Sequence, residues 1–359
     1  REEKIVEVGL LLIFQNYLGR GRDEDVVRNE TRLAELAEPL GYDKLWSVEH
    51  HFTDYAACPD NIQFLSYIAA RTSKIKLATG AVIVPWNNPL RVAEKIALLD
   101  HMSGGRAVLG LGRGLARVEY AGFGIEMSES RDRFDEASRM ILDALDKGFI
   151  EGEGPYYPQA RTEIRPRPLS GFRDRLYCVG MSPESVDQAA LLGARLMIFS
   201  QQTWETFAEG SLKQYRETYR KHHGGDPPPA LTGELMFCHE DPQRAEELAM
   251  EYMPNYFLTI IDHYEIMSDH FKTAKGYEFY ASSSDLFKEV GLENAAKGYC
   301  QVQTFGTPEQ ILEKLRWRRE LLGDFEINLI GNYGGMPFEE AEKSVSLFAR
   351  KVLPELQRW

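Results

Sequence analysis

The feature that most constrains the fold of this chain is the alternation of short apolar runs with longer amphipathic stretches. The runs are rich in β-branched residues and predict buried strands, whereas the amphipathic stretches have apolar residues at helical spacing. Eight such units follow one another, with strands predicted at 6–14, 43–49, 75–84, 106–114, 175–180, 194–200, 230–240 and 325–331. Strict alternation requires parallel strands, because each helical crossover returns the chain to the same edge of the sheet. The sequence therefore predicts an α/β fold, a (β/α)8 TIM barrel forming one domain over residues 1–359. A doubly wound sheet is the alternative, and it usually ends at about six strands.

Two segments depart from the alternation. Residues 149–174, after the fourth helix, are rich in Gly and Pro and predict an irregular insertion. Residues 258–304, before the last strand, have weak periodicity and several aromatic residues among polar ones. A segment of that length is too long for an idle loop. We expect a mobile lid over the site, with disorder or a partner-binding arm as alternatives.

Composition excludes several classes of function. Acidic residues outnumber basic ones by 55 to 42, and the net charge of −13 argues against nucleic-acid or anionic-membrane binding. The four cysteines form no CxxC pair and are expected to be reduced thiols of a cytoplasmic protein. No apolar run approaches the ~20 residues of a membrane helix. The charged N-terminus is unlike a signal peptide, although the chain does not start with Met and a trimmed leader stays open.

A histidine pair ends the second predicted strand, in the sequence Glu49-His50-His51. Active sites of TIM barrels lie at the C-terminal ends of the strands, so these side chains belong to the predicted mouth. Neighbouring strand residues point to opposite faces, no third ligand is evident and HExxH is absent, so no metal site is expected. Such a pair is often structural, but its position at a strand end favours proton transfer.

Two other strand ends predict an anion site. "GMSPES" at 180–185 places Ser182, Glu184 and Ser185 where a helix begins, and free N–H groups there favour phosphate. An ordinary helix cap is the simpler alternative. Arg113 in "GLGRG" and Arg131 add positive charges that can pair with the same phosphate. The glycines of "GLGRG" do not match the dinucleotide fingerprint; they provide clearance for a flat ring, or merely let the strand pack.

These motifs carry a family resemblance that covers nearly the whole chain. "EHHFTDY", "NPLRVAEKIALLDHMSGGR", "GLGRGL", "ESR", "MSPES", "KGYEF" and "GTPEQ" occur in the order found in bacterial luciferase and its flavin-dependent monooxygenase relatives. The resemblance implies the same barrel fold. It also implies an enzyme that receives reduced FMN from a separate NAD(P)H:flavin reductase and activates O2 as a C4a-peroxyflavin. The expected reaction is hydroxylation or Baeyer–Villiger-type insertion on a small organic substrate.

The resemblance also assigns residues. His50 matches the catalytic histidine, and Gly80–Ala81 matches a non-proline cis peptide beneath the flavin ring. Gly112 and Gln201 stand where light-emitting members have cysteine and tryptophan, so a more polar or differently shaped substrate than a long aldehyde is expected. The cofactor-binding set that the resemblance implies is Glu49, Gly80, Ala81, Arg113, Leu115, Arg131, Ser182, Glu184, Ser185, Ser200 and Gln201.

Two other functions stay open at this stage. Some barrel relatives use the deazaflavin F420 for hydride transfer, and others are non-catalytic flavin-binding subunits of heterodimers. The presence of His50 and of the long segment 258–304 disfavours the second alternative. Relatives dimerise through their second and third helices, so a homodimer is expected, with a heterodimer as the alternative.

Overall fold

A closed barrel of eight parallel strands forms the centre of the computed structural model, which describes residues 6–359 apart from the side chain of Ser283. Residues 1–5, on which part of the expectation about a leader rests, lie outside the described residues. Neighbouring strands follow the order β12-β1-β2-β3-β5-β8-β9-β10, and β10 pairs with β12 to close the barrel. The predicted TIM barrel is confirmed. Its strands are β1 (Val8–Leu12), β2 (Lys44–Ser47), β3 (Lys76–Thr79), β5 (Ala107–Gly112), β8 (Leu176–Val179), β9 (Arg195–Phe199), β10 (Ala230–Cys238) and β12 (Phe325–Ile330).

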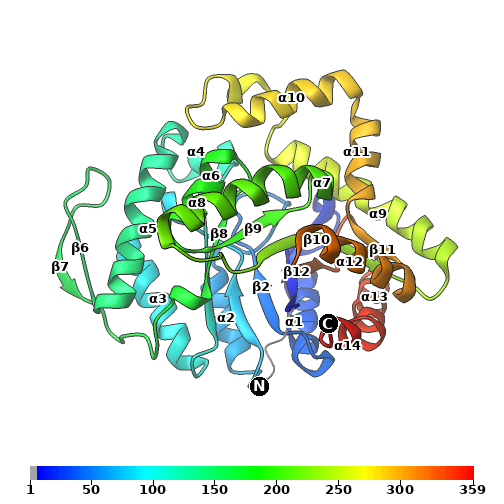
Figure 1. Ribbon diagram of the computed structural model, residues 1–359, viewed down its shortest axis with the longest axis horizontal. Coiled ribbons are helices and arrows are strands. Elements are labelled where there is room, and N and C mark those ends of the chain that lie inside the picture. The colour runs from blue at the N-terminus through cyan, green and yellow to red at the C-terminus, as the bar shows by residue number, and fades with distance from the viewer. Residues whose placement is uncertain (1–5) are drawn as a thin grey trace.

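The helices surround the barrel (Figure 1). Left-handed glycines at 41, 148 and 224 end three of them, since a residue without Cβ adopts positive φ freely. Thr307 and Gln310 start another with a reciprocal capping box. No helix within residues 6–359 is both long and apolar enough to cross a membrane. The helices are α1 (Asp23–Leu40), α2 (Asn61–Ala69), α3 (Pro89–Met102), α5 (Ser130–Lys147), α6 (Pro183–Leu191), α7 (Trp204–Phe207), α8 (Lys213–His223), α9 (Pro242–His263), α12 (Pro308–Leu322), α13 (Phe338–Lys351) and α14 (Leu353–Leu356).

Three local elements differ from the sequence prediction. The strand predicted at 75–84 is interrupted after Thr79, and β4 (Val82–Ile83) then pairs with β5 instead of continuing β3. A short helix, α4 (Arg117–Gly122), follows β5 where none was predicted. The insertion 149–174 contains an antiparallel hairpin of β6 (Phe149–Gly152) and β7 (Gln159–Glu163), which projects from the barrel (Figure 1).

The segment 258–304, in which the sequence shows only weak periodicity, is mostly helical. Helix α9 continues through His263, and α10 (Glu278–Val290) and α11 (Leu292–Gln301) follow before the short strand β11 (Thr304–Gly306). The weak periodicity has a packing cause: aromatic rings such as Phe257 and Tyr299, with centroids 5.1 Å apart, join α9 to α11. Figure 1 shows α10 at one end of the barrel, away from the N-terminus.

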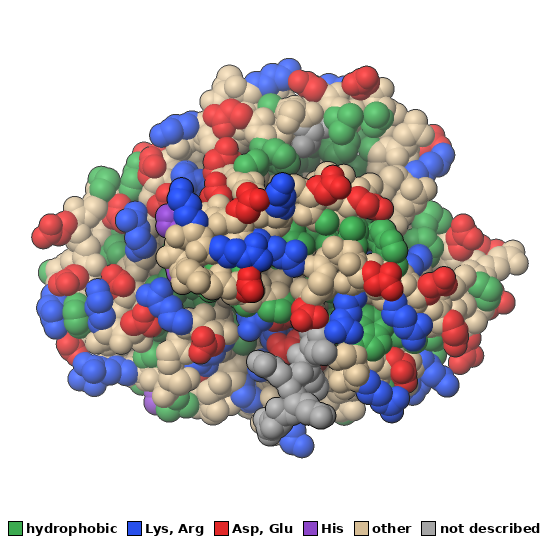
Figure 2. All heavy atoms as spheres, in the orientation of Figure 1, with side chains coloured by type: hydrophobic (Ala, Val, Ile, Leu, Met, Phe, Trp, Pro, Cys, Tyr) green, Lys and Arg blue, Asp and Glu red, His purple; other side chains and the backbone are tan. Residues whose placement is uncertain are grey.

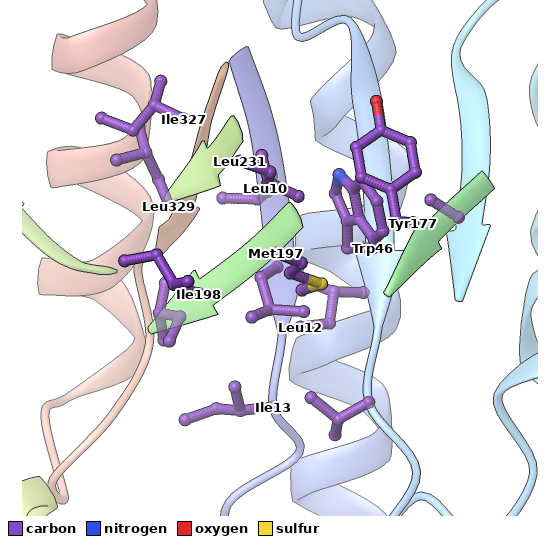
Figure 3. Packing of buried hydrophobic residues seen from close by; sticks show 14 of the residues in the cluster. Leu10, Leu12, Ile13, Trp46, Tyr177, Met197, Ile198, Leu231, Ile327 and Leu329 are labelled. Atoms are coloured by element: carbon purple, nitrogen blue, oxygen red, sulfur yellow. The ribbon is translucent and has the colours of Figure 1, made fainter. Parts of the chain in front are cut away.

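The barrel interior is filled by side chains from opposite strands (Figure 3). Trp46 on β2 meets the ring of Tyr177 on β8 edge to face, with centroids 4.9 Å apart. At the N-terminal end of the strands, the interior is polar and charged. Lys44 lies 2.5 Å from Glu326 and donates to the Tyr177 hydroxyl at 2.6 Å, and Arg195 donates to Glu326 at 2.6 Å. This charged layer closes the end of the barrel opposite the predicted mouth.

Candidate active site

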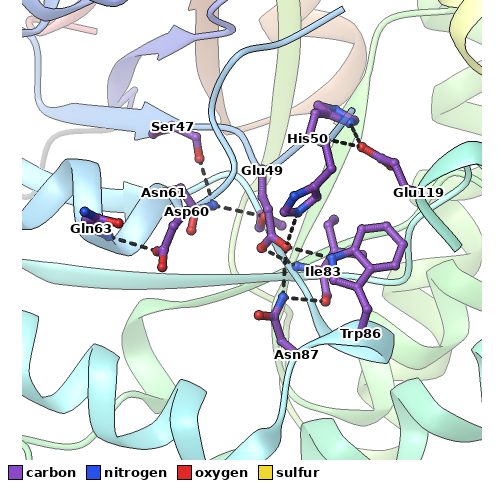
Figure 4. Close-up of polar contacts among 12 residues, drawn as sticks. Ser47, Glu49, His50, Asp60, Asn61, Gln63, Ile83, Trp86, Asn87 and Glu119 are labelled. Atoms are coloured by element: carbon purple, nitrogen blue, oxygen red, sulfur yellow. Dashed lines mark hydrogen bonds and ion pairs between the residues drawn. The ribbon is translucent and has the colours of Figure 1, made fainter. Parts of the chain in front are cut away.

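Glu49 is the anchor of the loop that leaves β2 (Figure 4). Its carboxylate is 5% exposed and accepts hydrogen bonds from Trp86 Nε1 at 2.8 Å, Asn87 Nδ2 at 2.9 Å and the Ile83 N–H at 3.1 Å. His51 Nε2 lies 3.1 Å from the same carboxylate. Both oxygens are therefore engaged by the protein. The expected contact of Glu49 with a cofactor stays a prediction, and the contacts present give it a role in shaping the mouth.

His50 faces the other way and pairs with Glu119 (Figure 4). Its Nδ1 lies 2.9 Å from Glu119 Oε1, which also accepts the His51 N–H at 2.8 Å. Glu119 is 1% exposed; burial raises its pKa, but attraction to His50 and the hydrogen bonds outweigh burial and lower the pKa below the ordinary value. A charged carboxylate on Nδ1 leaves Nε2 of His50 as the atom available for proton transfer.

A second histidine, on α9, borders this pair. His263 is buried, stacks on Tyr55 with centroids 4.2 Å apart, and has Nδ1 3.0 Å from Thr53 Oγ1. Its Nε2 lies 3.9 Å from Glu119 Oε1. Burial and the neighbouring His50 lower the pKa of His263 to about 3, so the ring is neutral at physiological pH.

Tyr264, the next residue along the chain, completes the surroundings of His50. Its hydroxyl lies 3.5 Å from His50 Nε2, and burial raises its pKa well above the ordinary value. The phenol therefore stays protonated at physiological pH and can act only as a neutral hydrogen-bonding group beside the imidazole. The C-terminal end of α9 thus contributes side chains to the barrel mouth.

The predicted anion site is assembled from three elements. Arg131, in the first turn of α5, donates from Nη2 to Ser185 Oγ at 2.9 Å. Ser182 caps α6 by accepting the Ser185 N–H and donates to Ser185 Oγ at 3.1 Å. Burial and the charge of Arg113 lower the pKa of Arg131, and attraction to the Asp135 carboxylate opposes this shift only in part. Glu184 is exposed at the start of α6 and also borders this region.

The segment before α10 covers the anion site. Arg113 is 7% exposed, donates from Nη1 to the Gly276 carbonyl at 2.8 Å and stacks on Tyr277, with Cζ 4.0 Å from the ring centroid. Tyr277 is completely buried and donates to the Gly114 carbonyl at 2.9 Å. A phosphate bound to Arg113 would therefore contact or displace this part of the segment 258–304.

The Gly80–Ala81 peptide is cis, as the resemblance implied. Asn61 on α2 fixes the turn by donating from Nδ2 to the carbonyls of Ala81 at 3.0 Å and Ser47 at 3.1 Å. A Cβ on Gly80 would point into the barrel and meet Trp46 at 3.3 Å. Both residues border the mouth, and their contact with a cofactor stays a prediction.

Glycine stands at positions 110 and 112 of β5 for two different reasons. A Cβ on Gly110 would approach the Thr79 carbonyl to 2.1 Å, so strand packing alone requires glycine there. A Cβ on Gly112 would lie 3.0 Å from Ile83 Cδ1, a flexible side chain. Leu115, beyond the strand, is half-buried and packs on the core. Of these two glycines, therefore, only Gly112 can have the predicted role of leaving space for a flat ring.

Two predicted residues follow β9. Ser200 is 3% exposed; its carbonyl accepts Gln303 Nε2 at 2.9 Å, and its hydroxyl has no partner within residues 6–359. A buried hydroxyl without a partner is unfavourable by about 1–3 kcal/mol, so a ligand atom there would stabilise it. Gln201 is exposed at the same strand end.

Sequence reasoning missed two side chains of this site, Glu119 and His263, and noted Tyr264 and Tyr277 only as aromatic residues of the segment 258–304. Glu119 lies on the unpredicted helix α4, although an acid shortly after a strand end was a usable signal. Its neighbour Tyr120 donates to the Arg113 carbonyl at 2.5 Å, so α4 joins the His50 pair to the anion site. The others belong to 258–304, where the aromatic content was noted but no partner could be named.

Comparison with known proteins settles the family. The model of the luciferase-like monooxygenase family matches residues 6–324. The chain belongs to the luciferase-like monooxygenase family. It is a flavin-dependent monooxygenase by that membership. The alkanal monooxygenase alpha chain of Photorhabdus luminescens is 24% identical over 337 residues, which cover 93% of this chain and 92% of that protein.

Solved structures of similar fold cover nearly the whole chain. Monooxygenase RslO1 from Streptomyces bottropensis has a TM-score of 0.81 at 26% identity, covering 98% of this chain and 99% of that one. The oxygenating constituent of 3,6-diketocamphane monooxygenase from Pseudomonas putida, a type II Baeyer–Villiger enzyme in complex with FMN, has a TM-score of 0.74 at 18% identity, with the same coverage. The F420-dependent tetrahydromethanopterin reductase of Methanopyrus kandleri has a TM-score of 0.70 at 18% identity, again with that coverage. A flavin-type cofactor fits the family, and the paired arginines and the unpartnered Ser200 hydroxyl fit such a group.

Proposed function

We propose that this chain is the oxygenase of a two-component system. It binds reduced FMN from a separate NAD(P)H:flavin reductase and uses O2 to hydroxylate, or insert oxygen into, a small organic molecule. The observation that carries the proposal is the position of His50–Glu119 and of Arg113–Arg131 on the same end of the barrel, joined by α4. Family membership and a structural neighbour in complex with FMN support it.

Each part of the chain has a separate task. Arg113, Arg131 and the N-terminus of α6 would hold the phosphate of the cofactor. Reduced FMN, when bound, would be the group that reacts with O2. Glu119 orients His50 through Nδ1, and His50 moves a proton at Nε2. The segment around Tyr277 excludes water from the mouth.

The substrate is inferred from the residues around the mouth. Gln201 and Gly112 border it in place of larger apolar groups, and Tyr55 and Tyr264 add phenols near His50. These groups favour a compact molecule with polar atoms over a long aliphatic one, and the Baeyer–Villiger name of one structural neighbour supports insertion beside a carbonyl.

We further propose that two copies associate through α2 and α3, where Tyr67, Leu98 and Met102 are about half exposed. Light scattering, which gives the molar mass in solution, tests whether the chain is a dimer.

The cofactor is tested by comparing FMN with riboflavin, which lacks the phosphate. Arg131→Met should weaken FMN binding about 10- to 100-fold, because a charged hydrogen bond contributes roughly 1.5–3 kcal/mol. Riboflavin binding should stay unchanged. Arg133→Met is the matched control, since Arg133 lies two residues away on α5 and pairs with Glu129. Equal losses for both flavins, or for both variants, would contradict the proposed phosphate site.

The reaction is tested by mixing the complex of reduced FMN with O2. The flavin absorbance should show a slow phase that free FMN lacks, and a panel of carbonyl compounds and arenes should gain one oxygen atom. A chain that binds F420 and not FMN would instead select the alternative of hydride transfer, which the Methanopyrus neighbour supports. Rapid oxidation of flavin to hydrogen peroxide without any protein-dependent phase would reject the oxygenase.

A further inference from the structure

We propose that His50, Glu119 and His263 form a binding site for a divalent transition-metal ion of the zinc class. Each residue offers one ligand atom, and the three atoms lie within 4.8 Å of one another. Glu119 Oε1 lies 2.9 Å from His50 Nδ1 and 3.9 Å from His263 Nε2. Zinc bonds of ~2.0–2.2 Å place tetrahedral ligand atoms about 3.4 Å apart, a value between these two distances. Small side-chain shifts therefore suffice for all three to reach one ion.

An independent observation points to a ligand at the same place. His263 Nε2 is buried and has no hydrogen-bond partner in the part of the chain that the structure describes. Its side chain is 2% exposed, so water does not compensate the loss. The other nitrogen, Nδ1, is engaged by Thr53 Oγ1 at 3.0 Å. With Nδ1–H donating to Thr53, Nε2 carries a lone pair directed into the cluster, and a metal ion would use it.

The surroundings have the features of a built metal site. Glu119 is fixed by the His51 N–H at 2.8 Å, and His263 is held by stacking on Tyr55. The rings of His50 and His263 are perpendicular, with centroids 5.2 Å apart, so their nitrogens converge without ring overlap. Two imidazoles and one carboxylate are the ligand set of zinc sites that keep a fourth position open. His50 is on the mouth side of the cluster and remains 15% exposed, which provides a path for the ion.

Metal binding would inhibit the oxygenase. Coordination through Nδ1 of His50 moves its proton to Nε2 and removes the lone pair that accepts protons there. The bound ion would also connect α9, through His263, to the loop after β2, through His50. This consequence, unlike the binding itself, rests on the proposed function.

The site is tested on flavin-free protein with Co2+ and Zn2+. Equilibrium dialysis should find one ion per chain, and bound Co2+ should show the intense visible absorption of a low-symmetry site. His263→Gln should weaken binding at least about 10-fold, and Thr53→Ala, which removes the outer contact, by about 10-fold. His270→Gln is the matched control: it lies on the same segment and also has an unpartnered buried Nε2, but it is outside the cluster.

Several results would overturn the site. These are no binding of either ion at micromolar concentration, unchanged affinity in His263→Gln, or equal losses in His263→Gln and His270→Gln. Thermal unfolding checks that each variant folds, and if His263→Gln does not fold, Glu119→Gln and Thr53→Ala decide the question with the same expected losses. Because no flavin is present, a chain that binds Zn2+ but fails every flavin test would retain this site and lose the proposed function.

Discussion

Glu119 shows how one buried carboxylate can organise a reactive residue. It accepts from both the His50 ring and the His51 backbone, and its lowered pKa keeps it charged. A fixed negative charge beside Nδ1 holds the imidazole in one tautomer and one orientation. The pair thus resembles the base-and-orienter arrangement by which enzymes prepare a histidine for proton transfer.

Replacing Glu119 by Gln should separate catalysis from binding. The amide oxygen can still accept from His50, but the charge is lost, so we expect turnover to fall about 100-fold with FMN affinity changed less than about 2-fold. His50→Asn should lower turnover at least as much. Glu129→Gln, at a carboxylate that pairs with Arg133, is the control and should leave both quantities unchanged. Undiminished turnover in His50→Asn would favour a different base, or a non-catalytic flavin-binding subunit.

Glu30 is a second buried carboxylate, with a different balance of forces. Burial raises its pKa to about 7. The hydrogen bond donated by Asn332 Nδ2 at 2.6 Å lowers the pKa but does not offset the burial. The unfolded chain loses this proton near pH 4.5, whereas the folded chain keeps it until about pH 7. The folded state therefore binds more protons between these values, and the free energy of unfolding falls as the pH rises through them.

Glu30→Gln should remove this pH dependence. We expect the free energy of unfolding of the variant, relative to the native chain, to increase by roughly 3 kcal/mol in total between pH 4.5 and pH 8. Urea unfolding at several pH values measures it. Glu24→Gln, at an exposed position of the same helix, should show no such trend. A constant difference across the range would mean that Glu30 is ionised in the folded state at all these pH values.

At the scale of elements, two helical segments build the mouth. Helix α4 presents Glu119 to His50 while its next residue, Tyr120, bonds the Arg113 carbonyl, so one turn of helix sets both halves of the site. The segment 258–304 then closes over them through Tyr277 and the Gly276 carbonyl. Hydrophobic side chains gather close to α10 and α11 at the top of Figure 2, where the lid meets the barrel.

Tyr277→Ala should loosen the lid. The change removes the stacking on Arg113 and the bond to the Gly114 carbonyl, so hydrogen exchange of residues 265–301 should become faster. Added FMN should slow this exchange in the native chain if the lid closes on its phosphate. Leu286→Ala, at an exposed position of α10, is the control. Exchange rates equal to those of the native chain would show that Tyr277 does not hold the segment.

At the scale of the whole molecule, closure of the barrel brings charged side chains together in its interior, at the N-terminal end of the strands. Lys44 contacts Glu326, Glu7 and the Tyr177 hydroxyl. The pKa of Glu7 falls to about 2 because its contacts with Lys44 and Lys76 outweigh its burial. Buried charges of this kind are weak evidence for stability as a set, but removal of one partner leaves the others uncompensated.

Lys44→Met should therefore destabilise the fold by about 3–5 kcal/mol, measured as the free energy of unfolding in urea. Lys76→Met is the control, because Lys76 pairs with Glu7 from a half-exposed position and should cost less than about 1 kcal/mol. Similar losses in the two variants would mean that the interior charges are solvated in the folded chain.

Strand and helix periodicity by itself determined the barrel, because eight alternating units leave few other ways to pair parallel strands. Strand ends are also local features of a sequence, so the positions of His50, Arg113 and the start of α6 at one mouth could be predicted. The family resemblance added the cis peptide at Gly80–Ala81, which the structure contains.

Only the tertiary structure decided which side chains meet. Glu119 and His263 are separated from His50 by 69 and 213 positions in the chain, and no periodicity links them. The hydrogen bonds of the Glu49 carboxylate with the loop after β4 could not be read from the sequence, and the helices of 258–304 depend on packing between aromatic rings. Local sequence records propensity and spacing, whereas partners across the barrel mouth depend on how the closed sheet brings its loops together.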